Sequence, residues 1–218
     1  MTQRALFLTF EGIEGCGKTT QAKLLGEMLH KRNIPVHVTR EPGGTRIGDQ
    51  IRKILLHSEN TDLVPLAELL LYEASRAQHV QEVIRPNIEN GFHVLCDRYG
   101  DASIAYQGAG RALTAELVRT ANQLATGGLQ PDLTLLIDID AEVGLSRARA
   151  RNLKFEFELD EGRFEEEDIR FHRKVRDGYL QLAQAEPQRF HIIDGAGSID
   201  KVQQKIQEIV FTQLRIKN

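Results

Sequence analysis

Two patterns of hydrophobic and polar positions alternate along the chain. Five short runs are rich in apolar, β-branched and aromatic residues, as is typical of buried parallel strands: residues 5–11, 36–40, 92–97, 133–139 and 190–193. Between them, apolar residues recur with the period of an amphipathic helix over residues 18–31, 47–57, 66–89, 114–125, 141–150, about 169–185 and 199–214. We expect Pro86 to kink the helix 66–89 near its end, and a glycine-rich segment to span 100–110.

Strands that alternate with helices predict an α/β fold. The expected architecture has three layers, with a mostly parallel central sheet of about five strands and helices on both faces. No linker rich in Ser, Pro or Gly divides the chain, so we expect one domain over residues 1–218. Many charges and few small apolar residues mark the segment from about 151 to 167, and we expect it to be a mobile flap.

The composition excludes several classes of function. Lys and Arg total 28 against 31 Asp and Glu, which argues against a protein that coats nucleic acid or an anionic membrane. No apolar run approaches the roughly 18 residues of a membrane helix. Two cysteines with no CxxC pair, and histidines with no HExxH spacing, argue against a structural zinc site. No secretory signal is evident either, so we expect a cytoplasmic protein.

Residues 12–19 match the phosphate-binding pattern G-x-x-x-x-G-K-[ST], with a predicted strand before them and a predicted helix after them. Glycines let successive N–H groups turn toward nucleotide phosphates, and the helix N-terminus adds partial positive charge. We expect Lys18 to reach the β- and γ-phosphates and the Thr19 hydroxyl to ligate Mg²⁺. The expected ATP phosphate-binding residues are Gly12, Ile13, Glu14, Gly15, Cys16, Gly17, Lys18, Thr19 and Thr20. A P-loop NTPase fold is therefore predicted.

A P-loop leaves the fate of the γ-phosphate open between transfer to a small molecule, hydrolysis coupled to motion, and a GTPase switch. The guanine-reading N-K-x-D element is absent from the sequence. A D-x-x-G match at 194–197 follows the last predicted strand, which is too far along the chain for the switch element of a GTPase. The GTPase interpretation is therefore rejected. A motor or remodelling ATPase stays as a weak alternative.

Four further segments favour one family: TREPGGT at 39–45, RAQH at 76–79, DRY at 97–99 and AYQG at 105–108. Together with the P-loop they resemble the bacterial thymidylate kinases, nearly from end to end. The resemblance implies transfer of the ATP γ-phosphoryl group to dTMP, giving dTDP and ADP for dTTP synthesis, by a homodimer that uses Mg²⁺. Another P-loop nucleoside or nucleoside monophosphate kinase is the alternative. In either case we expect neither nucleic acid nor a membrane as a partner.

The acceptor phosphate is expected near the ends of two strands. Arg98 ends a central strand, where ligands of open α/β sheets bind, and its guanidinium fork suits bidentate capture of a phosphate. By resemblance Arg98 and Arg40 contact the dTMP phosphate, and Pro42 shapes the acceptor pocket. Asp97 is expected to hold Mg²⁺ through water, or else to support the Thr19 side of the site. The resemblance also implies that Glu11, just before the P-loop, meets the sugar 3′-hydroxyl and the Arg/Lys network.

Thymine recognition is carried over from the resemblance to the helix 66–89 and the AYQG segment. Arg76 is expected to hydrogen-bond the base and Tyr72 to stack on it, although the commonest pattern in the family has Phe at the position of Tyr72. Ser103 and Gln107 are expected to face the base. The Tyr106 ring is expected to crowd the sugar 2′ position and so favour deoxyribose.

Catalysis is expected to need a cation from the flap. Some family members place an arginine in the P-loop where this chain has Glu14, and the other subtype supplies that charge from the flap. We expect Arg151 to supply it, with Arg163 as the second candidate. The expected catalytic set is therefore Lys18, Arg98, Arg151, Arg163 and Glu11. Gly162 stands where the family usually has Asp, which makes the flap the part of the sequence that departs most from the pattern.

Overall fold

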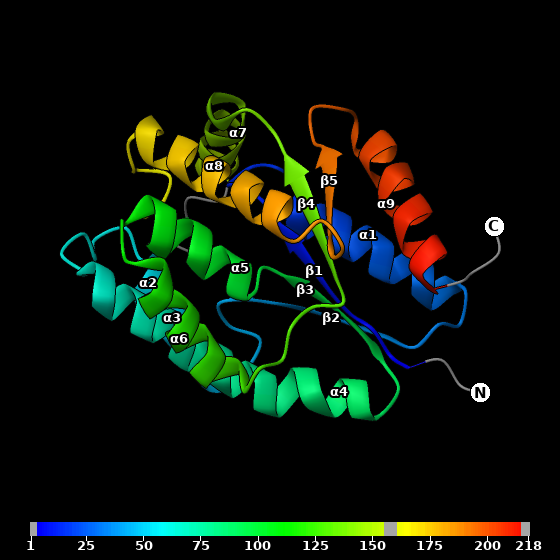
Figure 1. Ribbon diagram of the computed structural model, residues 1–218. Coiled ribbons are helices and arrows are strands. Elements are labelled where there is room, and N and C mark those ends of the chain that lie inside the picture. The colour runs from blue at the N-terminus through cyan, green and yellow to red at the C-terminus, as the bar shows by residue number, and fades with distance from the viewer. Residues whose placement is uncertain (1–3, 155–160, 215–218) are drawn as a thin grey trace.

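A five-stranded parallel sheet forms the centre of the molecule, as a computed structural model shows for residues 4–154 and 161–214 (Figure 1). The strands lie in the order β2-β3-β1-β4-β5, and every neighbouring pair is parallel. Their bounds are β1 Phe7–Glu11, β2 Val36–Arg40, β3 His93–Asp97, β4 Leu133–Asp138 and β5 Phe190–Asp194. The predicted parallel sheet of about five strands is confirmed.

Helices cover both faces of the sheet. Helix α1 (Lys18–Lys31) packs on β1, β2 and β3 beside α9 (Ile199–Leu214), while α8 (Ile169–Ala185) packs on β4 and β5 (Figure 1). The remaining helices are α2 Arg46–Leu56, α3 Pro65–His79, α4 Arg85–Glu89, α5 Gly100–Ser103, α6 Ala115–Thr126 and α7 Ala141–Lys154. Two π-helical turns join them, η1 Val80–Ile84 and η2 Ile104–Gly110. The three-layer α/β prediction is thus confirmed.

The structure differs from the sequence prediction where π-helical turns occur. The predicted helix 66–89 is three consecutive elements, α3, η1 and α4, because the wider turn η1 precedes Pro86, which lies in the first turn of α4. A first-turn proline has no intrahelical N–H bond to lose. The glycine-rich segment 100–110 is also helical, as α5 and η2.

The parallel arrangement brings the carboxyl ends of all strands to one edge of the sheet. Glu11, Arg40 and Asp97 end three adjacent strands there. The central strand β1 is buried along its whole length, so the loop that follows it is anchored to the core. Ligands of open α/β sheets bind at this edge.

The flap predicted for residues 151–167 falls partly outside the described residues. Residues 155–160 are not among them; 151–154 end α7, and 161–167 form turns that lead to α8. Arg52 of α2 donates two hydrogen bonds to Glu161, at 2.8 and 2.7 Å. No helix within the described residues is long and apolar enough to cross a membrane.

Candidate active site

The loop between β1 and α1 has the backbone that a phosphate cradle needs. Gly12, Gly15 and Gly17 have positive φ angles of 137°, 70° and 100°, a region that glycine enters without steric cost. A Cβ at Gly15 would lie 2.1 Å from the carbonyl oxygen of Gly144 in α7, so only glycine fits there. The Lys18 ammonium donates to the carbonyl oxygens of Gly12 (3.0 Å) and of Ile13.

A cleft of about 730 Å³ opens above this loop. One wall is the P-loop and the start of α1; the other comprises the residues after β2, the middle of α3, and η2. Most predicted site residues line it, namely Glu14, Gly15, Gly17, Lys18, Thr19, Thr20, Arg40, Pro42, Tyr72, Asp97, Arg98, Ser103, Tyr106, Gln107 and Arg151. Gly12, Ile13 and Cys16 do not line the cleft.

Thr19 and Asp97 lie together on the cleft wall. The Thr19 hydroxyl donates a hydrogen bond to Asp97 Oδ2, which joins α1 to the end of β3. Hydroxyl and carboxylate oxygens are the hard ligands that Mg²⁺ prefers, often through water. This pair therefore fits the predicted metal site.

A second group of potential ligands, Glu41, His79 and Cys96, is buried beside α3. Glu41 is already paired with the Arg76 guanidinium at 2.8 Å, and His79 uses one ring nitrogen for Glu41 and the other for Thr39. Burial raises the pKa of the Cys96 thiol well above its usual value. A cation neighbour and a protonated thiol both oppose metal binding.

Arg98 is the centre of a hydrogen-bond network at the cleft floor. Its φ of 70° turns the side chain from the end of β3 toward the P-loop. One terminal nitrogen donates to the Gly12 carbonyl oxygen (3.0 Å) and to the Tyr179 hydroxyl (3.1 Å). The other donates to Glu14 (2.9 Å) and to the Tyr106 hydroxyl (2.8 Å). The guanidinium is thereby held in one orientation at the cleft.

Glu14 is a P-loop carboxylate held in its charged form. Oε1 accepts from Arg98 and Tyr106, and Oε2 lies 3.2 Å from Nδ1 of His172 on α8. Burial alone would raise the pKa of Glu14, but the hydrogen bond with His172 and the charges of Arg98 and Lys18 lower it well below its usual value. The site therefore keeps one fixed negative charge beside its cations.

Glu11 lies beneath the cleft rather than on its surface. The side chain is fully buried and accepts hydrogen bonds of 2.7 Å from the Tyr99 backbone N–H and from the Tyr179 hydroxyl. Burial, followed by the negative charge of Asp101, raises its pKa from 4.5 to about 8. The structure thus places Glu11 where it supports the residues around Arg98.

Arg76 also lies behind the cleft surface, 1% exposed. Its guanidinium donates to Glu41, Glu73, Ser103, Asn122 and the carbonyl oxygen of Tyr99. The neighbouring positions Tyr72, Ser103, Tyr106 and Gln107 do line the cleft. The structure therefore brings a planar ring and polar side chains to one wall, with Arg76 directly bonded to Ser103.

The loop after β2 forms another part of the wall. The Glu41–Pro42 peptide bond is cis, and Arg52 donates to the Pro42 carbonyl oxygen at 3.0 Å. Arg40 lines the cleft with its side chain 54% exposed, 3.7 Å from Asp49. The Arg40 cation is therefore accessible from the cleft.

The two flap arginines occupy different places. Arg151 lines the cleft and pairs with Glu165 at 2.9 Å, its side chain 54% exposed. Arg163 is 5% exposed; its Nε donates to the Leu55 carbonyl oxygen, and a terminal nitrogen lies 2.8 Å from a carboxylate oxygen of Glu68. Arg163 lines a second, smaller pocket and not the cleft.

Several residues of this network were not predicted from the sequence. His172 and Tyr179 bond to predicted site residues from α8, more than 150 positions after the P-loop, and no local pattern marks them. Glu41 lies inside the TREPGGT segment, so that motif was a signal for it. Arg52 carried no signal beyond its charge.

The fold and the cleft define a P-loop phosphotransferase with room for a second substrate beside the nucleotide phosphates. The thymidylate kinase family model matches residues 10–206. Thymidylate kinases from Geobacter sp. (strain M21) and Pelobacter propionicus are 56% and 54% identical, over 96% and 97% of this chain and 92% and 96% of theirs. A crystal structure of thymidylate kinase from Ehrlichia chaffeensis matches with a TM-score of 0.77 and 32% identity, covering 95% of this chain and all of that one.

The chain therefore belongs to the thymidylate kinase family. It is an ATP-dependent kinase that phosphorylates dTMP to dTDP. The alternatives of a different monophosphate kinase and of a motor ATPase are set aside by these matches.

Proposed function

We propose that phosphoryl transfer takes place in the 730 Å³ cleft, with ATP phosphates on the P-loop wall and dTMP on the opposite wall. The observation that carries this assignment is that Lys18 and Arg98 line one continuous cleft together with Tyr72 and Gln107. The same single domain supplies both walls. The second phosphate pKa of dTMP is about 6, so the acceptor is already an anion near neutral pH and needs no strong base.

Alignment of two anions is then the main task of the protein. Arg98 presents a guanidinium whose orientation is fixed by Glu14, Tyr106 and Tyr179, and it binds the acceptor phosphate with Arg40 beside it. Lys18 binds the β- and γ-phosphates. Fixed cations that meet the charge of the transferring group act without reorganisation, which is where most of the rate enhancement arises.

Mg²⁺ is the divalent ion that the Thr19 and Asp97 oxygens would hold. Bound there, it would neutralise charge on the nucleotide phosphates. The protein's part is to keep the hydroxyl and the carboxylate together at the end of β3. Asp97 would act through a water molecule.

Arg151, rather than Arg163, is the flap cation in this proposal. Arg151 lines the cleft, and its partner Glu165 holds it there. Arg163 has its guanidinium engaged with Glu68 and Leu55 beneath the surface. A single arginine aimed at a transferring phosphoryl group accelerates transfer by about 10³- to 10⁵-fold.

The base is recognised by the wall that α3 and η2 form. Tyr72 stacks on thymine, Ser103 and Gln107 face its polar edge, and Arg76 orients Ser103 from behind. The Tyr106 ring excludes a 2′-hydroxyl. Glu11 is buried beneath the cleft and supports the site through Tyr179, rather than meeting the sugar 3′-hydroxyl.

A panel of nucleoside monophosphates tests this proposal. With ATP and Mg²⁺, kcat/KM for dTMP should exceed that for dCMP, dGMP and AMP by about 10⁴-fold, because a site with buried polar groups rejects partners that leave them unpaired. UMP against dUMP isolates the contribution of Tyr106. Comparable turnover of AMP would contradict the assignment of the base pocket.

A homodimer in the cytoplasm is part of the proposal. The neighbouring helices α2, α3 and α6 lie on one side of the molecule (Figure 1). They carry exposed apolar side chains, namely Ile54, Leu66, Leu70, Leu117 and Leu124. We propose that these side chains contribute to the dimer interface, since exposed apolar surface on neighbouring helices is covered when two copies associate. Light scattering should give a dimer for the wild type and for Ile199→Glu, and a monomer for Leu70→Glu; a monomeric wild type would refute the dimer.

A further inference from the structure

A fully buried carboxylate connects the acceptor wall of the cleft with residues 161–168, here called the return segment. Glu68 on α3 is 0% exposed. Its Oε1 accepts a 2.8 Å hydrogen bond from Gln107 of η2, and its Oε2 lies 2.8 Å from Arg163 of the return segment. One side chain thus contacts both the base pocket and the polypeptide that follows α7.

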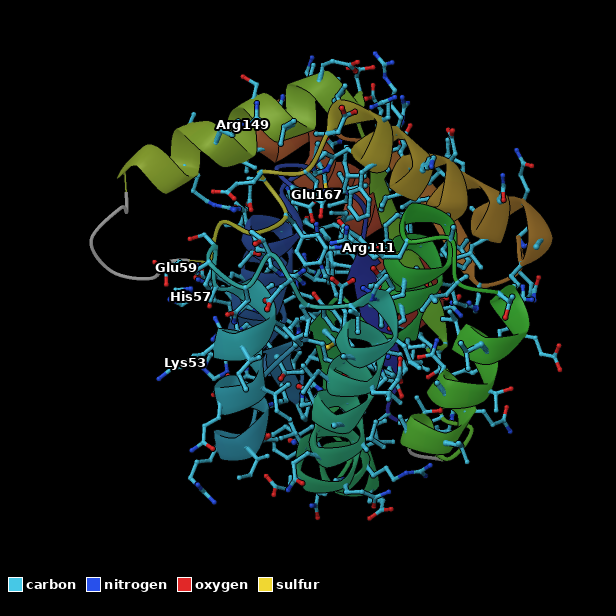
Figure 2. All side chains as sticks on the ribbon, turned by 90° about the vertical axis from the view of Figure 1, so that its left-hand side faces the viewer. Lys53, His57, Glu59, Arg111, Arg149 and Glu167 are labelled. Atoms are coloured by element: carbon cyan, nitrogen blue, oxygen red, sulfur yellow. The ribbon has the colours of Figure 1, made fainter. Side chains whose placement is uncertain are left out.

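Arg111, just after η2, makes a second connection between the same parts. It donates to both oxygens of Glu68, at 3.3 and 3.2 Å, and pairs with Glu167 of the return segment at 2.6 Å. Figure 2 shows Arg111 and Glu167 directed toward one another. The four charged groups therefore form one cluster in which negative and positive charges alternate.

The balance of this cluster depends on Glu68. Arg163 is 5% exposed, so without the carboxylate it would be a buried and unneutralised cation. Removing one partner of a buried pair is far more costly than removing both. Loss of the Glu68 charge should therefore displace Arg163, and with it the backbone on either side.

The residues next to Arg163 lie on the cleft. Phe164 packs edge-on against the Tyr106 ring with centroids 5.4 Å apart, and Glu165 accepts a 2.9 Å hydrogen bond from Arg151. Both Phe164 and Glu165 line the cleft. Displacement of Arg163 would therefore change the placement of Arg151 without removing any group that touches substrate.

We propose that Glu68 is a positioning residue for phosphoryl transfer, which fixes the return segment against the acceptor wall and so aligns Arg151 with the cleft. The inference rests on the proposed function, in which Arg151 acts on the transferring group. Since Glu68 is bonded to Gln107, occupation of the base pocket and placement of the return segment are linked through one carboxylate.

Glu68→Gln tests the proposal, because it removes the charge and keeps the size of the side chain. We expect kcat to fall about tenfold or more while KM for ATP changes less than about threefold, since the P-loop is untouched. Amide hydrogen exchange over residues 161–168 should become faster. Glu186→Gln is the matched control: Glu186 also accepts from an arginine, Arg189, but lies outside the cleft.

The double variant Glu68→Gln/Arg163→Gln separates positioning from general stability. With both charges removed, kcat should recover at least partly toward the wild type, because no buried cation is left unneutralised. This variant also carries the test if the single one does not fold. Unchanged kcat in folded Glu68→Gln, unchanged exchange over 161–168, or a double variant slower than the single would each overturn the proposal. If instead Arg151→Ala turns over like the wild type, the role of Arg151 fails, while faster exchange in Glu68→Gln would still show the structural link.

Discussion

Replacement of Glu11 by Gln tests whether this buried carboxyl makes the folded protein less stable as pH rises. Burial and the charge of Asp101 raise its pKa from 4.5 to about 8. The unfolded chain releases this proton near pH 4.5, whereas the folded protein keeps it until about pH 8. Folding therefore takes up a proton between these two pH values. The stabilisation that Glu11 contributes is complete below the lower pKa, decreases as pH rises between the two pKa values, and is lost above the upper one.

The size of the effect follows from the same shift. Each pH unit inside the window lowers the free energy of unfolding by at most about 1.4 kcal/mol. Over the whole window this gives an upper limit of about 5 kcal/mol. The charge of Arg98 and the hydrogen bond from Tyr179 both lower the pKa of Glu11, and their effects are already included in its value of about 8. A Gln at this position does not titrate, and its amide oxygen still accepts one hydrogen bond. Glu11→Gln should therefore lose less stability than the wild type between about pH 5 and pH 8.

Urea unfolding followed by far-ultraviolet circular dichroism measures this slope; the chain has no tryptophan to report by fluorescence. The difference in free energy of unfolding between variant and wild type should grow by several kcal/mol, in favour of the variant, from about pH 5 to pH 8. Glu186→Gln leaves Glu11 in place and should follow the wild-type slope. Parallel curves for Glu11→Gln and the wild type would refute the raised pKa.

Substitutions at four further positions test the assigned roles. Arg151→Ala should lower kcat about 10³-fold with little change in KM for dTMP, whereas Arg98→Ala should lower kcat and also raise the KM for dTMP. Single-turnover rates at saturating substrate separate the two variants, and equal behaviour of both would contradict the assignment. Tyr72→Phe should keep KM for dTMP within about threefold and Tyr72→Ala should raise it about 5- to 150-fold, the range of base stacking, so equal KM values would exclude stacking. Gly15→Ala should abolish nucleotide binding in calorimetry, because its Cβ would lie 2.1 Å from the Gly144 carbonyl oxygen; wild-type affinity would show that the loop adapts.

Most of the fold was predictable because its signals are local. Continuous apolar runs mark strands buried on both faces, and β1 is buried at every position. The P-loop was equally clear, since its chemistry depends on glycines at fixed spacing. The two π-helical turns were not predictable, because an i→i+5 turn is set by what packs against it: α8 lies along η2 and places Phe171 where a Cβ at Gly110 would be 2.6 Å away.

The site was predicted less completely than the fold, for a related reason. Motifs located many of the residues that line the cleft, but not the partners that hold them. Arg76 is an example: its position in the long helix was clear, yet Glu41 and Asn122, which help to hold its guanidinium behind the cleft surface, lie 35 and 46 residues away. A residue's neighbours in space decide whether a charged group faces substrate or supports another side chain.

Arg151 and Arg163 show why charge alone could not identify the flap cation. Both lie in a segment rich in Arg and Glu, and the sequence favours Arg151 as the expected donor of positive charge, with Arg163 as the second candidate. The distinction comes from Glu68, which is 0% exposed and lies some 95 residues before Arg163 in the sequence. A buried carboxylate requires a cation beside it, and Arg163 lies 2.8 Å away. Arg163 neutralises that charge and is itself buried, whereas Arg151 has a side chain 54% exposed on the cleft wall, where a phosphate that arrives from solution can reach it.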